Sequence, residues 1–255
     1  MERTISSFWC FQNIKISGIA GAVPKSKIDI LKDHDFVSVE EREKTIRLTG
    51  ISTYRKARLD QTTADFCEAA TKTLLNDINV KPDSIDAIIF VTMSPDYITP
   101  STSCILQDKL GLSKDTIAFD VNLGCSGYVY GLYIACSLIQ GGGLKRVLLL
   151  SGDTQTKMIH PKDKSVAFLF GDAGTATLVE SENCLPEIKM KLMTDGSRKD
   201  SLIVPAGGFR MPSTAETRQV KKQIDGGLRS LEHIYLDGMG VFNFSITDAV
   251  DTIRD

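Results

Sequence analysis

A cysteine set between glycines is the residue of this sequence whose surroundings best suit covalent chemistry. Cys125 stands in the run Gly-Cys-Ser-Gly at 124–127, directly after the strand-like run Asp-Val-Asn-Leu at 120–123. Where a strand turns sharply into a helix, unpaired backbone N–H groups of the first helical turn favour a thiolate by roughly 1–2 kcal/mol. Cys125 is therefore a candidate nucleophile, and the same N–H groups could hold an oxyanion.

Other cysteines and short motifs give weaker signals. The sequence has six cysteines but no CxxC pair, and its three histidines are scattered, so neither a disulfide framework nor a metal site is expected. Cys136 falls inside an apolar stretch and is expected to pack. The sequence has no phosphate-binding loop, no dinucleotide fingerprint and no G-x-S-x-G elbow. A structural role for Cys125 also stays open, because free cysteines are often buried.

The composition narrows the class of protein. Of 255 residues, 42% are hydrophobic and 24% charged, and the net charge is −2. These values are typical of a folded globular protein and speak against a nucleic-acid partner, which would favour a basic surplus. The apolar runs are too short to cross a membrane, and the N-terminus has no signal-peptide core. We therefore expect a cytoplasmic protein with no membrane association.

Strands and helices alternate on both sides of Cys125. The strand expected at 86–93 has almost no alternation: its central run Ala-Ile-Ile-Phe-Val is apolar, which is typical of a parallel strand covered on both faces. Further strands are expected at 14–20, 116–122 and 147–151. A capping box at Ser38 and Glu41 opens a helix that ends at Gly50, and other helices are expected after Thr62, after Pro100 and near Ser126. This order predicts an α/β fold with a largely parallel sheet.

The helix expected at 128–139 contains no charged residue. An apolar helix of this kind is predicted to be buried on all sides, with protein layers on both flanks. A last amphipathic helix is expected over 241–253, with one apolar face made by Phe242, Ile246, Ala249, Val250 and Ile253.

The segment 181–236 has the weakest pattern, mixing Pro, Gly, Ser and charge. We interpret it as a solvated, lid-like insertion, with a binding patch around Arg218, Lys221 and Lys222 as the alternative. The chain is thus divided into residues 1–180, which carry the nucleophile, the insertion at 181–236, and residues 237–255.

Several of these runs together resemble the β-ketoacyl-acyl-carrier-protein synthase III family of the thiolase superfamily. The resemblance covers about 14–180, with weaker echoes at 195–197 and 237–242. It rests on Thr49-Gly50-Ile51, Pro100-Ser101, Phe119-Asp120-Val121, Cys125-Ser126-Gly127, Ser151-Gly152-Asp153 and Phe170-Gly171-Asp172-Ala173-Gly174.

The resemblance implies a thiolase-like layered αβαβα architecture whose second half is incomplete in this chain. It implies an acyltransferase of fatty acid biosynthesis, in which Cys125 takes up an acyl group and condenses it with a malonyl thioester. It implies no resident cofactor, because acyl-coenzyme A or an acyl-carrier-protein thioester is the substrate. The implied partners are acyl carrier protein and either a second copy in a homodimer or a complementary C-terminal chain.

Departures from the family pattern qualify this expectation. Family members carry a catalytic His and Asn, and none of His34, His160 and His233 matches the histidine motif. Where relatives often have Trp and Arg near the coenzyme A end, this sequence has Lys44 and Leu48. Lys164 also replaces an Arg, and Lys meets phosphate only as a point charge. These changes favour a carrier-protein donor, with Gly50 and Lys164 as candidates near the pantetheine entrance.

Thr99 precedes Pro100 where acetyl-primed relatives tend to carry Phe. The smaller side chain predicts a primer longer than acetyl, although a pre-proline residue in an extended backbone is an equal explanation. Two further functions stay open. One is an acyltransferase that keeps the acyl-Cys125 step and passes the group to an alcohol or amine. The other is a half subunit of a two-chain synthase or a non-catalytic relative.

Overall fold

The computed structural model describes residues 8–224 and 226–254, which divide into two compact units. The first unit comprises Met1–Pro24, Ala57–Asp153 and Asp172–Leu192, described from residue 8 onward. The second comprises Lys25–Lys56, Thr154–Gly171 and Met193–Asp255, without residues 225 and 255. Cys125 belongs to the first unit. The division of the chain expected from the sequence, into 1–180, 181–236 and 237–255, remains a prediction. Its first and last residues, 1 and 255, lie outside the described residues.

A five-stranded mixed sheet lies at the centre of the first unit. Its order is β2-β8-β7-β5-β6, with bounds Ile14–Ala22, Asp172–Ser181, Arg146–Thr154, Ala87–Val91 and Ile117–Val121. Strand β5 runs parallel to β6 and β7, placing Ile89 opposite Phe119 and Leu149, whereas β2 is antiparallel to β8. All of β5 is buried, which confirms the predicted strand covered on both faces.

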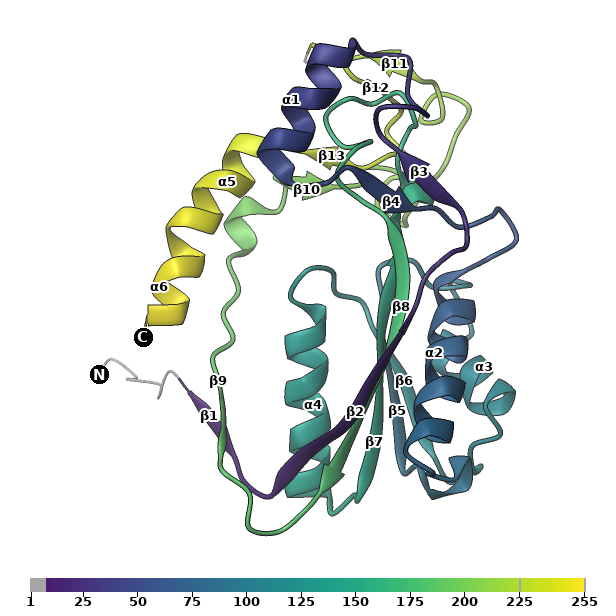
Figure 1. Ribbon diagram of the computed structural model, residues 1–255, viewed down its shortest axis with the longest axis vertical. Helices are drawn as coiled ribbons and strands as arrows, with labels where there is room; N and C mark the ends of the chain where they lie inside the picture. Colours follow the sequence, from purple (N-terminus) through teal and green to yellow (C-terminus); the bar gives the residue numbers. More distant parts are fainter. Residues whose placement is uncertain (1–7, 225, 255) are drawn as a thin grey trace. The chain divides into compact units, whose positions relative to one another are not determined.

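Helices cover both faces of this sheet (Figure 1). Helices α2 (Thr63–Asp77) and α3 (Thr102–Lys109) share one core with Ile88 and Phe90 of β5. Helix α4 (Gly127–Gly142) shares the other core with Ile89 and its neighbours. Successive strand side chains point to opposite faces, so an unbroken apolar strand supplies both layers. The predicted α/β layering is confirmed.

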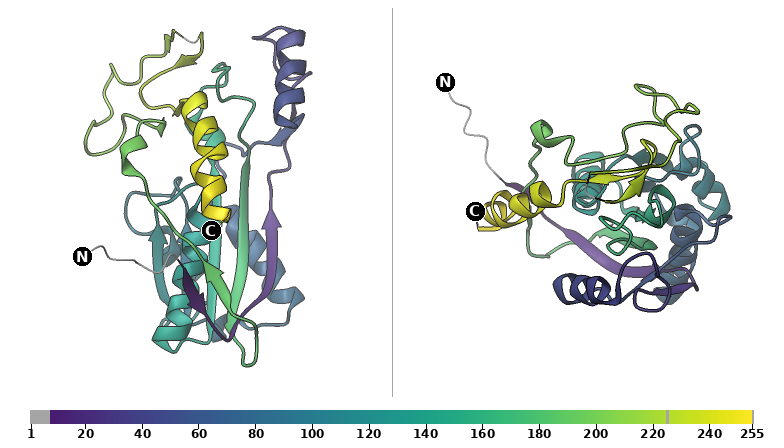
Figure 2. Two further views of the ribbon diagram at one scale, coloured as in Figure 1. Left: turned by 90° about the vertical axis from the view of Figure 1, so that its left-hand side faces the viewer. Right: turned by 90° about the horizontal axis from the view of Figure 1, so that it is seen from above.

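Helix α4 is not buried on every side within the described residues. Ala135 and Cys136 are fully buried, but Val129 is 44% exposed. Strand β1 (Trp9–Phe11), paired with β9 (Ile188–Met190) as Figure 2 shows, brings Trp9 against the Tyr133 ring at 5.4 Å. The prediction of burial on all sides is therefore wrong here: the sheet and β1 pack against the helix, while the side with Val129 is open.

The second unit consists of short elements. Helix α1 (Val39–Thr49) begins as predicted at Ser38, whose Oγ accepts a hydrogen bond from the Glu41 N–H at 3.2 Å, and ends at Gly50 in the left-handed conformation. The other elements are the strand pairs β3 (Lys27–Asp29) with β4 (Thr53–Arg55), β10 (Leu202–Ile203) with β13 (Tyr235–Leu236), and β11 (Lys221–Lys222) with β12 (Leu228–Arg229), together with short 3-10 turns at Gln155–Met158 and Gly196–Arg198.

The predicted helix over 241–253 is divided into two. Helix α5 (Gly238–Ile246) begins at Asp237, whose side chain accepts from the Gly240 N–H, and α6 (Asp248–Arg254) follows Thr247. Phe242 and Ile246 are 57% and 53% exposed, so the predicted apolar face is not covered by described residues. The side chain of Ile253 lies outside the described residues.

Candidate active site at the strand-to-helix turn

Cys125 lies in the turn that joins β6 to α4, and it is exposed. Strand β6 ends at Val121, and the helix begins at Gly127 after the N-cap residue Ser126. Inside the turn, the Gly127 N–H donates to the Gly124 carbonyl at 2.7 Å. The thiol thus stands one residue before the N-cap of a 16-residue helix, as predicted, and solvent reaches it.

Two glycines fix the start of α4 against the sheet. A Cβ atom on Gly127 would lie 2.6 Å from Val91 Cγ1, and one on Gly131 would lie 2.5 Å from Leu149 Cδ1. Both distances are shorter than real carbon contacts, so these positions accept only hydrogen without rearrangement of the core. The close approach sets the height of the helix above β5, and therefore the place of the cysteine turn.

The buried thiols differ from Cys125 in their surroundings. Burial raises the pKa of Cys67 to about 12 and that of Cys136 to about 11. Both thiols are fully buried, which agrees with the packing role expected for Cys136. Cys10, Cys104 and Cys184 are exposed. Exposure alone therefore does not single out Cys125; its position beside a helix N-terminus does.

Two carboxylates organise the loops around the cysteine turn. Asp120, in β6, accepts hydrogen bonds from the N–H groups of Thr102 and Ser103 at 2.7 and 2.8 Å, which caps α3. Asp153, in β7, accepts from the N–H of Met93 at 2.8 Å. In the sequence, Asp120 and Asp153 are recognised only as parts of the family motifs, and no role was predicted for either. Their common signal is a lone carboxylate near the carboxyl end of an apolar strand, where α/β sheets bind ligands.

Thr99 lies on the loop that precedes α3, and its side chain is exposed. The peptide bond between Thr99 and Pro100 is cis. Asp120 ties the first residues of α3 to β6, the strand that leads into the cysteine turn. Thr99 and Cys125 therefore lie on two loops of the same unit, and Asp120 connects the elements that follow and precede these loops. The role of Thr99 in acyl selection remains a prediction.

Gly50 and Lys164 belong to the second unit and do not form one site. The Lys164 Nζ lies 4.0 Å from Glu41 Oε1, near the start of α1, whereas Gly50 ends that helix. Gly50 stands nine positions after Glu41 along the helix, a rise of about 13 Å. Lys44 and Leu48, one turn apart between them, are both exposed on α1. Their roles in thioester recognition stay predictions.

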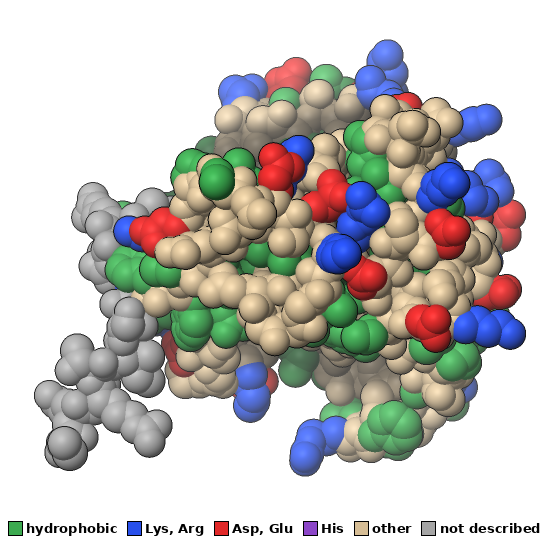
Figure 3. Space-filling view, turned by 90° about the horizontal axis from the view of Figure 1, so that it is seen from below, with side chains coloured by type: hydrophobic (Ala, Val, Ile, Leu, Met, Phe, Trp, Pro, Cys, Tyr) green, Lys and Arg blue, Asp and Glu red, His purple; other side chains and the backbone are tan. Residues whose placement is uncertain are grey.

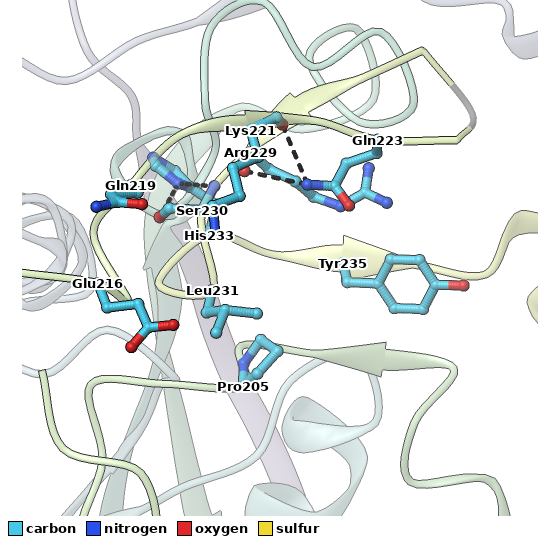
Figure 4. Close-up of a pocket in the computed structure, with 10 residues that line it drawn as sticks. All are labelled: Pro205, Glu216, Gln219, Lys221, Gln223, Arg229, Ser230, Leu231, His233 and Tyr235. Carbon is cyan, nitrogen blue, oxygen red and sulfur yellow. Dashed lines mark hydrogen bonds between the residues drawn. The ribbon is translucent and has the colours of Figure 1, made fainter. Parts of the chain in front are cut away.

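A cavity of about 340 Å³ lies beside the basic stretch of the second unit (Figure 4). Lys221, Glu216 and Tyr235 are among the residues that line it. Arg229, which also lines it, is nearly buried and pairs through Nη1 with the fully buried Asp163 at 3.1 Å. A buried pair of this kind is costly to break, so it anchors the segment. The segment 181–236 thus contains a buried ion pair at this point, and its interpretation as a lid-like insertion stays a prediction.

Charge does not mark a site on the face drawn in Figure 3, where Lys and Arg side chains alternate with Asp and Glu. Among the described residues, His, Cys, Asp and Glu form no group of three or more that could hold a metal ion. None of the described helices combines the length and apolar character needed to span a membrane.

Known proteins are similar to this chain over a region that includes Cys125. The sequence model of the family described as 3-oxoacyl-[acyl-carrier-protein] synthase III matches residues 119–196. A Campylobacter jejuni protein named as a 3-oxoacyl-[acyl-carrier-protein] synthase 3 is 39% identical over 241 residues, covering 92% of this chain and 67% of its own length. A β-ketoacyl-[acyl-carrier-protein] synthase III of Caldanaerobacter subterraneus is 38% identical, covering 78% of this chain and 57% of its own length.

Solved structures similar to this chain include a protein of the same description. The crystal structure of a 3-oxoacyl-(acyl-carrier protein) synthase from Burkholderia xenovorans superposes with a TM-score of 0.89 and 35% identity. The superposition covers 98% of this chain and 70% of that one. This chain therefore spans between about half and about two thirds of the length of the relatives described here.

Proposed function

The chain belongs to the 3-oxoacyl-[acyl-carrier-protein] synthase III family, and from this membership we propose that Cys125 accepts an acyl group and passes it to a malonyl thioester. Membership confirms the resemblance, the thiolase-like fold and the condensing-enzyme class that the sequence predicted. The activity, substrates and partners of this chain itself are proposals, because it covers only part of its relatives.

One observation supports the role of Cys125 most directly. Its thiol is exposed at the N-terminal side of α4, inside the region that the family model matches. A buried thiol such as Cys67 has neither access to an acyl donor nor an accessible thiolate near neutral pH. Cys125 combines access with the positive end of a helix dipole.

The proposed chemistry has two steps. In the first, the Cys125 thiolate attacks the carbonyl carbon of an acyl thioester, the donor thiolate leaves, and the acyl group becomes a thioester on Sγ. In the second, a malonyl thioester loses carbon dioxide, and the resulting carbanion attacks the acyl carbonyl. The Cys125 thiolate then leaves, and a 3-oxoacyl thioester is released. The backbone N–H of Cys125 stabilises the negative oxygen of both tetrahedral intermediates.

For the acyl donor, we propose an acyl-carrier-protein thioester in preference to acyl-coenzyme A. The support is chemical: Lys44, Leu48 and Lys164 stand where relatives tend to have residues that stack on or fork around the nucleotide. The Leu48 side chain is 76% exposed on α1, and because it is aliphatic it supplies neither a ring that could stack on a nucleotide nor a charge.

An acyltransferase that uses the same acyl-Cys125 and an alcohol or amine acceptor is the second candidate. Within this sequence, none of His34, His160 and His233 matches the family histidine motif, so the general base of a condensation is not identified among them. In the structure, His34 packs among aromatic rings, with Phe168 at 5.0 Å and Tyr54 at 6.0 Å between ring centroids, which fits a structural role.

Product analysis separates the two candidates. The protein is incubated with an acyl-carrier-protein thioester and malonyl thioester, and release of the donor thiol and of carbon dioxide is followed together. Condensation predicts both, in equal amounts, and loss of both in Cys125→Ser but not in Cys104→Ser, which removes another exposed thiol. Thiol release without carbon dioxide, accompanied by an ester or amide when an acceptor is added, would support transfer. Release of neither would contradict both candidates.

A further inference from the structure

The loop that follows β5 is held by one carboxylate oxygen. Asp153 Oδ1 accepts hydrogen bonds from the Met93 N–H at 2.8 Å, the Thr92 hydroxyl at 3.0 Å and the Ser94 hydroxyl at 3.0 Å. Three consecutive residues thus donate to a single atom. The Ser94 hydroxyl also lies 2.8 Å from Thr63 Oγ1 of α2, which attaches the loop to the first layer of helices.

The side chain in the middle of this loop lies against the cysteine turn. A Cβ atom placed on Gly124 would be 2.6 Å from Met93 Sδ and 2.8 Å from Met93 Cε. The thioether therefore occupies the space beside the α-carbon that immediately precedes Cys125. The Gly124 carbonyl also accepts from the Gly127 N–H at the start of α4. Gly124 is thus in contact with Met93 and hydrogen-bonded to the first residue of the helix.

The carboxylate of Asp153 is partly buried and therefore loses part of its hydration. Burial raises its pKa above the ordinary value, even though the bonds from Met93, Thr92 and Ser94 oppose that change. A partly buried carboxylate with three local donors fixes the geometry of the loop strongly, because loss of the acceptor would leave the Met93 N–H without the hydrogen bond that it makes to Asp153.

We infer that Asp153 is a positioning residue for the nucleophile: its hydrogen bonds to the 92–94 loop set Met93, and Met93 holds the Gly124–Cys125 backbone beside the N-terminus of α4. This inference rests on the proposed role of Cys125. Asp153 touches no reacting atom; it acts through Met93. A shift of the thiol by about 1 Å is enough to slow a reaction roughly a hundredfold.

The test compares two substitutions of one residue. Asp153→Asn keeps an oxygen at the Oδ1 position as acceptor, whereas Asp153→Ala removes it. The rates of acylation and of iodoacetamide alkylation at Cys125 are measured by peptide mass spectrometry, with exposed Cys104 as an internal reference. We expect Asp153→Ala to slow both reactions at Cys125 by about tenfold or more, and Asp153→Asn to stay within about threefold of the parent protein.

A second pair of variants tests the contact with Met93. Met93→Leu conserves the volume and should retain the rate, whereas Met93→Ala should lower it as Asp153→Ala does. Gly124→Ala should slow Cys125 by pushing against the thioether, and adding Met93→Ala should restore part of that loss. Such recovery would show that the two residues act through one contact.

The buried thiol of Cys67 reports whether a variant merely unfolds. In a folded variant Cys67 stays unlabelled, so a slow Cys125 with a protected Cys67 supports positioning. Equal loss in Asp153→Asn and Asp153→Ala, or a Cys125 rate in Asp153→Ala within twofold of the parent, would overturn the inference. Slowing of Cys125 only alongside labelling of Cys67 would overturn it as well. If the parent protein alkylates but never acylates, the proposed function fails while alkylation still tests positioning.

Discussion

At the scale of single residues, the account depends on how the environments of the thiols differ. Cys125 stands beside a helix N-terminus in solvent, whereas Cys67 and Cys136 have no exposed surface. The sequence alone supported this distinction for Cys125 and Cys136, because the first follows a strand end and the second lies within an apolar helix. It gave no comparable role to Asp120 or Asp153, since a lone carboxylate has a role only when its donors are known.

Labelling by iodoacetamide at pH 8 tests the environments of the buried thiols. With a pKa of about 12, Cys67 has roughly one thiolate in ten thousand thiols at that pH, and Cys136, at about 11, has roughly one in a thousand. We expect both to remain unmodified in the folded protein and to react once urea unfolds it. Peptide mapping before and after unfolding is the measurement. Rapid modification of Cys67 under native conditions would contradict its placement.

Thr99 supplies a prediction about the acyl chain. Replacing it by Phe should fill space on the loop before α3 and shift the preferred primer toward acetyl. We expect the preference for an eight-carbon over a two-carbon thioester to fall about tenfold or more, which is in the range that pocket size controls. Thioesters of graded length, compared for acylation of Cys125, provide the measurement. A sharp optimum at acetyl in the parent protein would refute the prediction.

At the scale of elements, close packing of α4 on β5 sets the position of the cysteine turn. The apolar run Ala-Ile-Ile-Phe-Val inside the strand expected at 86–93 was sufficient to predict a strand buried on both faces, because such a run leaves no polar face for solvent. The uncharged helix at 128–139 was less informative. Lack of charge indicates that a helix can be buried, but its covering layers are set by tertiary contacts, and Val129 is open to solvent.

Glycine substitutions in α4 test this packing. Gly131→Ala places a Cβ against Leu149 and Val91, and overpacking of this kind costs about 1–3 kcal/mol of the free energy of unfolding. Gly141→Ala, where a Cβ meets no atom within 4 Å, should instead stabilise the protein by up to about 1 kcal/mol through helix propensity. Urea unfolding of both variants is the measurement. Equal stabilities for the two would argue against the close approach.

In the second unit, local sequence patterns predicted the ends of a helix but not the contacts between distant residues. The cap residues Ser38 and Gly50 bound α1 as predicted, because caps are local features. The buried pair of Asp163 with Arg229 joins residues far apart in sequence, so no local pattern announced it. The division of the last helix at Thr247 was missed for a similar reason, since its apolar spacing continues through the break.

At the scale of the whole molecule, several apolar side chains are exposed on the described surface. Phe242, Phe244 and Ile246, all on α5, are examples. A soluble monomer rarely keeps large apolar patches open to water, so we predict that the chain associates with itself in solution. Light scattering coupled to size exclusion should give a mass above the 28.0 kDa of one chain. A single peak at the monomer mass over a wide concentration range would contradict this.

The location of the acyl group tests the central claim most directly. The protein is exposed to an acyl thioester, quenched in acid to preserve thioesters, digested, and every cysteine peptide is weighed. We predict one acyl group per chain, carried by Cys125 and released by hydroxylamine, and none in Cys125→Ser. An acyl group on Cys10, Cys104 or Cys184 in place of Cys125, or an undiminished adduct in Cys125→Ser, would contradict the account.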